Sequence, residues 1–448
     1  MGFRKRIIAA AGVLAAVGVL AAAALSARQL PGVSGDNVLF HRPTITLWYT
    51  DEKLEDYLAS VSLDYLDAYG VRVLPVLTDG LEYLEAVNEA SLNQENAPDL
   101  YIVSNDSLEK AYLAGLAVPL GDMLNTDSFP QTALDAVCYQ GERVAYPLYF
   151  ETSALIYNRT YLEQAAQELG TDWESLVPST IEDVLTFASE YNAPEQVEAV
   201  LRWDVSDFFY NYFFAGNYID MGGSCGDDPK QIDIYNLEAV RGLAAYQNLS
   251  QFFSIDAAAS SYDRVVQDFL DGKLVFTLAT TDILGRVQEA KDAESFPYEY
   301  GVARLPDINE EICSRGVSVT YGTAVNGYSE KREEAEQFAA WLSTEGAEKL
   351  YDRTGLVPAS RAAAQKEPEQ AAFWEEYAVT SPMPKMMRTS NFWVQMEIAT
   401  TKIWEGENVS DILKGLSEAV MTQVAGEPYT ETEYIEVPSE EETQGMED

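Results

Sequence analysis

Histidine is almost absent from this chain of 448 residues, because His41 is the only one. It precedes the first predicted strand, so histidine-based triads, histidine metal sites and most histidine general bases are excluded from the rest of the fold. Cysteine is also scarce, since Cys138, Cys225 and Cys313 lie far apart and form no C-x-x-C pair. This spacing excludes a zinc knuckle and a thioredoxin-like site, and it allows one disulfide at most.

Basic residues are few: 29 Lys and Arg face 73 Asp and Glu, which gives a formal net charge of −44. Such a charge opposes binding to nucleic acid or to an anionic membrane surface. The chain also contains no Walker loop and no G-x-G-x-x-G sequence. We therefore expect no cofactor, no metal and no nucleic-acid partner. Catalysis by a pair of carboxylates stays open, because acidic residues are abundant.

The two ends of the chain read as segments outside the folded body. Three basic residues at positions 4–6 precede an uncharged run up to residue 27, which is typical of a secretory leader. Residues 1–27 are therefore predicted to be a signal peptide or an N-terminal anchor, and residues 28–43 a linker. Arg28 stands where a lipobox would need Cys, so the body is expected to be extracytoplasmic, either secreted or held at the outer face of the membrane. The acidic tail, residues 427–448, is predicted to be disordered.

The body opens with alternating strand and helix patterns over residues 44–114, which predicts a parallel sheet and an α/β fold. Ligands of open α/β sheets bind at the carboxyl ends of the strands. Candidate ligand contacts at those ends are Trp48, Tyr49, Asp51, Asn105 and Asp106. Trp48 is equally explained as a core aromatic, and the two aspartates as helix N-caps.

The segment from residue 141 to 165, GERVAYPLYFETSALIYNRTYLEQA, predicts two short strands that meet at residues 149–152. A helix with Thr160 as N-cap and Gly170 as stop follows. Taken alone, this segment fits an ordinary β-hairpin edge. Its Phe150–Glu151 pair places an aromatic ring and a carboxylate at the junction of the two predicted strands.

This segment resembles the Y-x-P…Y-N signature of the family 1 extracellular solute-binding proteins, the sugar-binding components of ATP-binding-cassette importers. TITLW, A-P-D, F-L-D-G-K, Y-G-V-A-R-L-P and G-L-V-P-A follow in the family's order, between residues 44 and 424. The resemblance implies a periplasmic-binding-protein-like fold of two α/β lobes, joined by hinge strands, with a ligand cleft between them. Lobe I would comprise residues 44–149 plus 317–352, and lobe II residues 150–316 plus 353–426.

The resemblance also implies further site residues. A glutamate placed like Glu151 faces the cleft in the maltose-binding branch, an aromatic helix within residues 199–223 stacks on sugar rings, and a second crossing lies near Tyr321. The chain departs from the family at residues 279–282, where Ala-Thr-Thr-Asp replaces a cleft tryptophan. The remaining candidates for the cleft are Phe150, Trp203, Asp207, Phe208, Tyr210, Gly223 and Asp282, with Trp393 and Trp404 as outer possibilities.

The resulting expectation is a monomeric binding protein, not an enzyme, that captures a sugar or oligosaccharide by lobe closure and delivers it to an ABC-type permease. Two alternatives remain. The same fold could bind a non-sugar solute such as a polyamine or a peptide, since the acidic residues suit a cation as well as hydroxyl groups. An extracellular glycosidase would need a carboxylate pair across the scissile bond.

Overall fold

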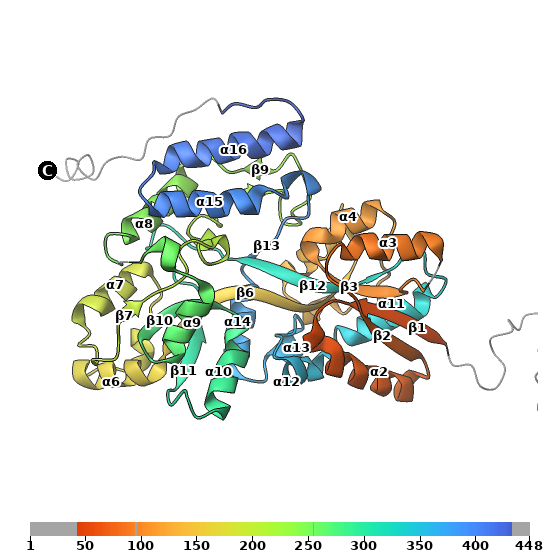
Figure 1. The fold of residues 1–448 in the computed structure, drawn as a ribbon, viewed down its shortest axis with the longest axis horizontal. Helices are drawn as coiled ribbons and strands as arrows, with labels where there is room; N and C mark the ends of the chain where they lie inside the picture. The colour runs from red at the N-terminus through yellow and green to blue at the C-terminus, as the bar shows by residue number, and fades with distance from the viewer. Residues whose placement is uncertain (1–42, 95, 254, 432–448) are drawn as a thin grey trace, which may run out of the picture.

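The computed structural model describes residues 43–94, 96–253 and 255–431 (Figure 1). The predicted leader, nearly all of the predicted linker and most of the acidic tail lie outside these residues. The first five tail residues, 427–431, pack back on helix α16 (Val409–Ala425): the Tyr429 amide donates to Thr422 at 3.1 Å and the Ser417 hydroxyl to Glu431 at 2.5 Å. Among the helices of the described ranges, none has both the length and the apolar character needed to span a membrane.

The strands form one mixed sheet with the order β2-β1-β3-β12-β6-β10-β7, while β11 pairs with β6 and β13 with β12. Two short hairpins, β4-β5 and β8-β9, lie apart from it. The strands are β1 (Thr44–Tyr49), β2 (Arg72–Leu77), β3 (Leu100–Ser104), β4 (Cys138–Tyr139), β5 (Glu142–Arg143), β6 (Tyr146–Asn158), β7 (Ala199–Leu201), β8 (Asp220–Met221), β9 (Ile232–Asp233), β10 (Leu274–Thr280), β11 (Tyr300–Ala303), β12 (Val317–Val325) and β13 (Ser381–Pro382).

Strand β6 belongs to both halves of this sheet. Its first half pairs with β12, from Tyr146 to Thr152, and its second half pairs with β10 and β11. In Figure 1, β6 and β12 cross the middle of the molecule between two groups of helices. The protein therefore has two α/β lobes joined by shared strands. We call the half with β1, β2 and β3 lobe I and the half with β7, β10 and β11 lobe II.

In lobe I, β1 pairs in parallel with β2 and β3, as the strand–helix alternation predicts. Alternate residues of β1 are buried, because one face of the strand packs on the core. The helices of this half are α2 (Glu55–Tyr69), α3 (Tyr83–Asn93), α4 (Leu108–Leu113), α5 (Gln131–Ala136), α11 (Arg332–Leu342) and α12 (Leu350–Thr354).

Lobe II has a second core, in which aromatic rings of the 199–223 stretch pack against the two C-terminal helices. Its helices are α6 (Arg159–Leu169), α7 (Ile181–Glu190), α8 (Leu237–Leu249), α9 (Tyr262–Leu270), α10 (Ile283–Asp292), α14 (Pro368–Tyr377), α15 (Phe392–Trp404) and α16. The short α13 (Arg361–Ala364) lies beside α12, on the lobe I side (Figure 1). Helix α7 begins with a capping box: Thr180 accepts from the Asp183 amide, and Asp183 accepts from the Thr180 amide.

The prediction of two strands within residues 141–158 is wrong, because β6 runs unbroken for 13 residues. Proline cannot donate to a ladder and normally interrupts a strand. Here Pro147 lies opposite Gly322, next to a bulge in β6: Tyr321 and Gly322 of β12 face Tyr149 and Pro147, which leaves Leu148 as the extra residue. The helix that follows is capped by Asn158, which accepts from the Tyr161 amide at 3.2 Å, and not by Thr160. Gly170 ends it in the left-handed conformation, as predicted.

The expected aromatic helix within residues 199–223 is also wrong. The stretch folds into two short 3-10 helices, η5 (Phe208–Tyr210) and η6 (Tyr212–Phe214). The Asn211 side chain donates to the carbonyls of Asp204, at 2.9 Å, and Asp207, at 2.7 Å. These bonds hold the backbone in turns, because short polar side chains compete with helical hydrogen bonds.

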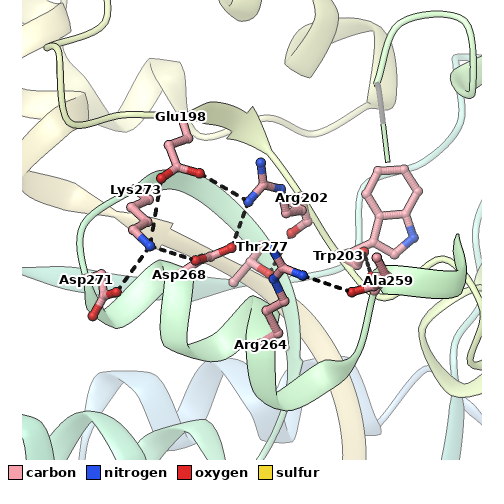
Figure 2. Close-up of polar contacts among 10 residues, drawn as sticks. Glu198, Arg202, Trp203, Ala259, Arg264, Asp268, Asp271, Lys273 and Thr277 are labelled. Carbon is pink, nitrogen blue, oxygen red and sulfur yellow. Dashed lines mark hydrogen bonds and ion pairs between the residues drawn. The ribbon is translucent and has the colours of Figure 1, made fainter. Parts of the chain in front are cut away.

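A cluster of ion pairs connects neighbouring segments at the outer edge of lobe II (Figure 2). Asp268 of α9 receives Arg202 at 2.7 Å and Lys273 at 3.1 Å. Lys273 also lies 3.3 Å from Asp271, and Glu198 lies 3.6 Å from Arg202. We call these five residues the edge cluster. It ties α9 to the segments that flank β7 and β10.

Candidate ligand-binding site

One face of the sheet carries polar and aromatic side chains where the two lobes meet. Side chains of alternate strand residues share a face, so Tyr149, Glu151 and Ser153 of β6 point to the same side. Their partners across the ladders are Tyr321 and Val319 on β12 and Thr280 on β10. Residues from both lobes therefore surround Glu151.

Glu151 is a half-buried carboxylate with an unfavourable charge. Burial is the main cause that raises its pKa, and the nearby carboxylates Asp282 and Asp51 raise the pKa further, whereas Lys53 lowers it. Within the described part of the chain, its carboxylate takes part in no hydrogen bond or ion pair. A desolvated carboxylate without donors is well prepared to accept them from a ligand.

Lobe I supplies the loop that follows β1. Asp51 caps the 3-10 helix η1 (Glu52–Leu54) by accepting from the Lys53 amide at 2.9 Å. The Lys53 side chain is exposed and its charge acts on Glu151. Asp51 therefore has the helix-capping role, and it lies within electrostatic reach of Glu151. Its role as a ligand contact stays a prediction.

Two tyrosines form the floor beside Glu151. The rings of Tyr149 and Tyr321 stack with their centroids 4.5 Å apart and their planes 9° apart. Burial raises the pKa of Tyr321, followed by the charges of Glu151, Asp106 and Asp51. A cavity of about 300 Å³ borders these rings and is lined by Asp51, Ser104 and Ser107, among others. Asp106 is exposed and accepts from the Ser107 hydroxyl at 3.3 Å.

Lobe II contributes an aromatic border. The Ser153 hydroxyl donates to the Phe209 carbonyl at 3.2 Å, which fixes η5 to the same face of β6 as Glu151. Asp207 caps η5 through the Phe209 amide at 2.8 Å, and burial raises the pKa of Asp207. Phe208 is partly buried, and its ring lies 4.8 Å from that of Trp393, centroid to centroid.

Asp282 lies near Glu151, but its oxygens are occupied. The Tyr262 hydroxyl donates to it, and the Arg286 guanidinium pairs with it at 2.7 Å. Tyr262 in turn stacks on Tyr210, with centroids 5.0 Å apart, and receives the Thr280 hydroxyl at 2.9 Å. The small polar segment at residues 279–282 therefore borders the site and is held in place by its bonds to Tyr262 and Arg286.

The structure brings most of the polar candidates together and leaves several aromatic ones elsewhere. We call the assembled set the junction site. It comprises Asp51, Lys53, Asp106, Tyr149, Glu151, Asp282 and Tyr321, with Tyr210 behind Asp282 through Tyr262. We add Phe208 as a candidate member, because the bond from Ser153 holds η5 on this face of β6, and Trp393 packs on the Phe208 ring.

Trp203 does not reach the junction site, because only 1% of its surface is exposed. Its indole N–H donates to Asn211 at 2.8 Å, and its ring meets Trp404 edge-on at 5.5 Å. Trp404 is buried in the same core. Phe150 is likewise fully buried, on the opposite face of β6 from Glu151, where it stacks on Tyr377 at 3.9 Å.

Three lobe I candidates also serve the fold. Tyr49 is buried in the main core, and Trp48, on the other face of β1, packs against a smaller core cluster. Asn105 is fully buried: its amide donates to the Met383 carbonyl at 2.6 Å and accepts from the Thr320 amide at 2.9 Å. It therefore links lobe I to two connecting segments, and because it is fully buried it exposes no surface to a ligand.

Gly223 lies in the β8–β9 turn with φ +70°, and its amide donates to Asp220 at 2.6 Å. It borders a different cavity, so nothing places it at the junction site. Sequence reasoning missed Lys53, whose only signal is its position two residues after Asp51. Within the described ranges, no group of three or more His, Cys, Asp and Glu residues is arranged to hold a metal ion.

Two α/β lobes that share their central strands, with a polar and aromatic site at the crossing, define a two-lobed solute-binding protein. Comparison with known families agrees with this class. The chain belongs to the bacterial extracellular solute-binding protein family, whose model matches residues 67–379.

Individual relatives are similar at low identity. The maltodextrin-binding protein MdxE of Bacillus subtilis is 24% identical over 357 residues, which covers 78% of this chain and 82% of that protein. A maltotriose-binding protein of Pyrococcus abyssi is 23% identical, covering 77% of this chain and 74% of that protein.

Solved structures share the fold. An extracellular solute-binding protein of Staphylococcus aureus, in complex with maltose, superposes with a TM-score of 0.73 at 21% identity, covering 85% of this chain and 98% of that one. The maltose-binding protein MalE of Listeria monocytogenes, also with maltose, gives 0.72 at 22% identity, with coverages of 87% and 100%.

Proposed function

We propose that this protein binds a carbohydrate, a sugar or an oligosaccharide, at the junction site and delivers it to the permease of an ABC importer. The observation that carries the proposal is Glu151, a half-buried carboxylate without donors on the strand that both lobes share. Sugar hydroxyls donate readily to carboxylates, and the C–H faces of a sugar ring pack on aromatic rings such as Phe208 and Tyr321. The relatives that bind maltodextrin and maltotriose support this choice of ligand.

We propose further that binding closes the lobes by rotation about the shared strands. Lobe I would comprise residues 44–149 and 317–352, and lobe II residues 150–316 and 353–426. Closure would desolvate contacts that each lobe makes only in part when open. Micromolar affinity needs only about 8 kcal/mol, which a few stacked rings and charged hydrogen bonds supply. The protein would act as a monomer at the outer face of the cell.

A second candidate ligand is a cationic solute such as a polyamine. The observation that favours it is the excess of acid at the junction site, where Asp51, Asp106 and Glu151 face Lys53 as the nearest cation. Asp282 adds to this excess: it shares Arg286 with Asp263, and of the nearby charges it raises the pKa of Glu151 most. A glycosidase is less well supported, because the relatives are named as binding proteins.

A thermal-shift screen of the purified full chain tests the proposal. The probes are maltose, maltotriose, longer maltodextrins, spermidine and short peptides. A ligand at about 100 times its dissociation constant stabilises the folded state by about 2.7 kcal/mol. We expect a shift with a saccharide that is recovered unchanged. A shift with spermidine alone would favour the cationic ligand, and consumption of the saccharide would show an enzyme.

A further inference from the structure

Two of the three cysteines lie together, although 87 positions separate them in the sequence. Cys138 is on β4, next to lobe I, and Cys225 is in the β8–β9 turn of lobe II. Both are half-buried free thiols, whereas Cys313 is exposed. The two thiols are close enough that each is the largest influence on the pKa of the other.

Further contacts fix the two segments against each other. The Gln140 amide, two residues after Cys138, donates at 2.6 Å to Asp227, two residues after Cys225. The Lys385 amide donates to the Gly226 carbonyl at 2.9 Å. A Cβ at Gly226 would lie 2.7 Å from the Cα of Pro384. The β8–β9 turn therefore packs directly against the backbone around Pro384. The proximity of the thiols is therefore a result of the packing around them.

The surroundings also favour a reactive thiol. The buried Lys385 ammonium donates to the carbonyls of Asp135, at 3.0 Å, and Cys225. The neighbouring Cys225 thiol is the largest cause that lowers the pKa of Cys138, to about 7, with smaller contributions from the Gly141 amide and Lys385. A thiolate fraction at neutral pH is what thiol–disulfide exchange requires.

We propose that Cys138 and Cys225 form a reversible disulfide that links the β4–β5 hairpin beside lobe I to the β8–β9 turn of lobe II. The family is extracellular, and thiols outside the cytoplasm meet oxidants that form disulfides. The bond would close a long loop of chain, which stabilises a fold chiefly by restricting the unfolded state. It would also tether the two lobes close to their connecting segments.

The oxidant is a disulfide, either a small molecule such as oxidised glutathione or an exported oxidoreductase. The Cys138 thiolate attacks one sulfur of this disulfide and releases the other as a thiol, after it takes up a proton. Cys225 then loses its proton to solvent and attacks the Cys138 Sγ in the mixed disulfide, and the second thiol leaves. Two protein thiols are oxidised, and one external disulfide is reduced to two thiols.

The direct test counts thiols in the full chain equilibrated with reduced or oxidised glutathione. We expect three free thiols after reduction and one after oxidation, with peptide mapping that joins the Cys138 peptide to the Cys225 peptide. The matched control Cys313→Ser should fall from two thiols to none. Three free thiols under oxidising conditions, or a bridge that includes Cys313, would overturn the proposal.

Melting curves provide a second readout. Oxidation should raise the melting temperature of the wild type and of Cys313→Ser by several degrees, because both retain the pair. Cys138→Ser and Cys225→Ser should melt at one temperature under both conditions. If either serine variant kept the full redox-dependent shift, the shift would not come from this pair, and the proposal would fail. The wild-type comparison needs no variant, so it remains informative even if a serine variant fails to fold.

Discussion

Two charged regions of this protein border cavities of similar size, yet their charges are arranged in opposite ways. At the edge cluster, beside a cavity of about 210 Å³, Asp268 and Glu198 face Arg202 and Lys273 within ion-pair distance. At the junction site, Asp51, Tyr149 and Tyr321 line a cavity of about 300 Å³. Glu151, on the same face of β6 as Tyr149, has no such partner, and two other carboxylates act on it. Cavity size therefore does not distinguish the regions, but the pairing of charges does.

The pKa shifts express the same contrast. The pKa of Lys273 is raised, mainly by its hydrogen bond to Asp268, so its charged form is favoured. The pKa of Glu151 is also raised, but by burial, so its charged form is disfavoured. A raised pKa thus indicates a stabilised charge in a cation and a destabilised one in a carboxyl group. The edge cluster stabilises the fold, whereas the junction site retains an unmet demand for hydrogen-bond donors.

The largest effect is expected from Glu151→Ala at the junction site. Removing a carboxylate that accepts ligand hydrogen bonds should weaken saccharide binding about 100-fold, the upper range for charged hydrogen bonds. The melting temperature of the free protein should hardly change, because Glu151 has no partner to lose. Calorimetric titration and melting curves measure the two effects. A large melting shift with unchanged affinity would make Glu151 a structural residue.

The matched change at the edge cluster is Asp268→Ala. It leaves Arg202 and Lys273 without their shared partner, which should destabilise the fold by about 1–2 kcal/mol, since both cations keep some contact with water. Chemical denaturation measures this loss, and saccharide affinity should stay at the wild-type value. A loss of affinity as large as that of Glu151→Ala would remove the distinction between the two regions.

An intermediate effect is expected from Phe208→Ala. In the proposed site the Phe208 ring, which packs on Trp393, stacks on the sugar from the lobe II side. Loss of a stacking contact costs about 1 kcal/mol, or about fivefold in affinity. Titration with the same saccharide measures it. Tyr69→Ala, which removes an exposed ring on α2, serves as the control and should leave affinity unchanged. Equal effects from both changes would show that Phe208 does not contact the ligand.

The smallest effect concerns pH. Because the pKa of Glu151 is raised in the folded state, its contribution to stability is present below the ordinary glutamate range and is lost as pH rises through the raised pKa. Glu151→Gln should remove this dependence. The melting temperature of the variant, relative to that of the wild type, should therefore rise as pH increases from about 4 to 7. Melting curves that stay parallel across this range would show that Glu151 ionises as freely as an exposed carboxylate.

The sequence was sufficient for the lobe I sheet, because apolar runs separated by Gly, Pro and Asp mark each strand and helix from Thr44 to Leu113. It could not predict the unbroken β6, since Pro147 lies beside a bulge at Leu148 that appears only when β6 pairs with β12, far away in the chain. Alternation along β1 predicts that Trp48 and Tyr49 lie on opposite faces, but which face is buried depends on helices elsewhere.

The same limit applies to the candidate site. Glu151 could be singled out because its motif marks the crossing, and Asp51 and Asp106 because they follow strand ends. The sequence could not divide the aromatic residues around Trp203 into buried rings and ligand-facing rings, because both kinds have the same local sequence signal. Only the turn held by Asn211, and the packing of Trp203 on Trp404, decide which rings are buried.

The most direct test of the account is amide hydrogen exchange on the full chain with and without maltotriose. If the ligand binds at the junction site, protection should increase in three separate segments: around Asp51, around Glu151 and around Phe208. The segments of the edge cluster should exchange as before. Protection confined to the edge cluster or to the β8–β9 turn, with none around Glu151, would contradict the assignment of the junction site as the place where a sugar binds.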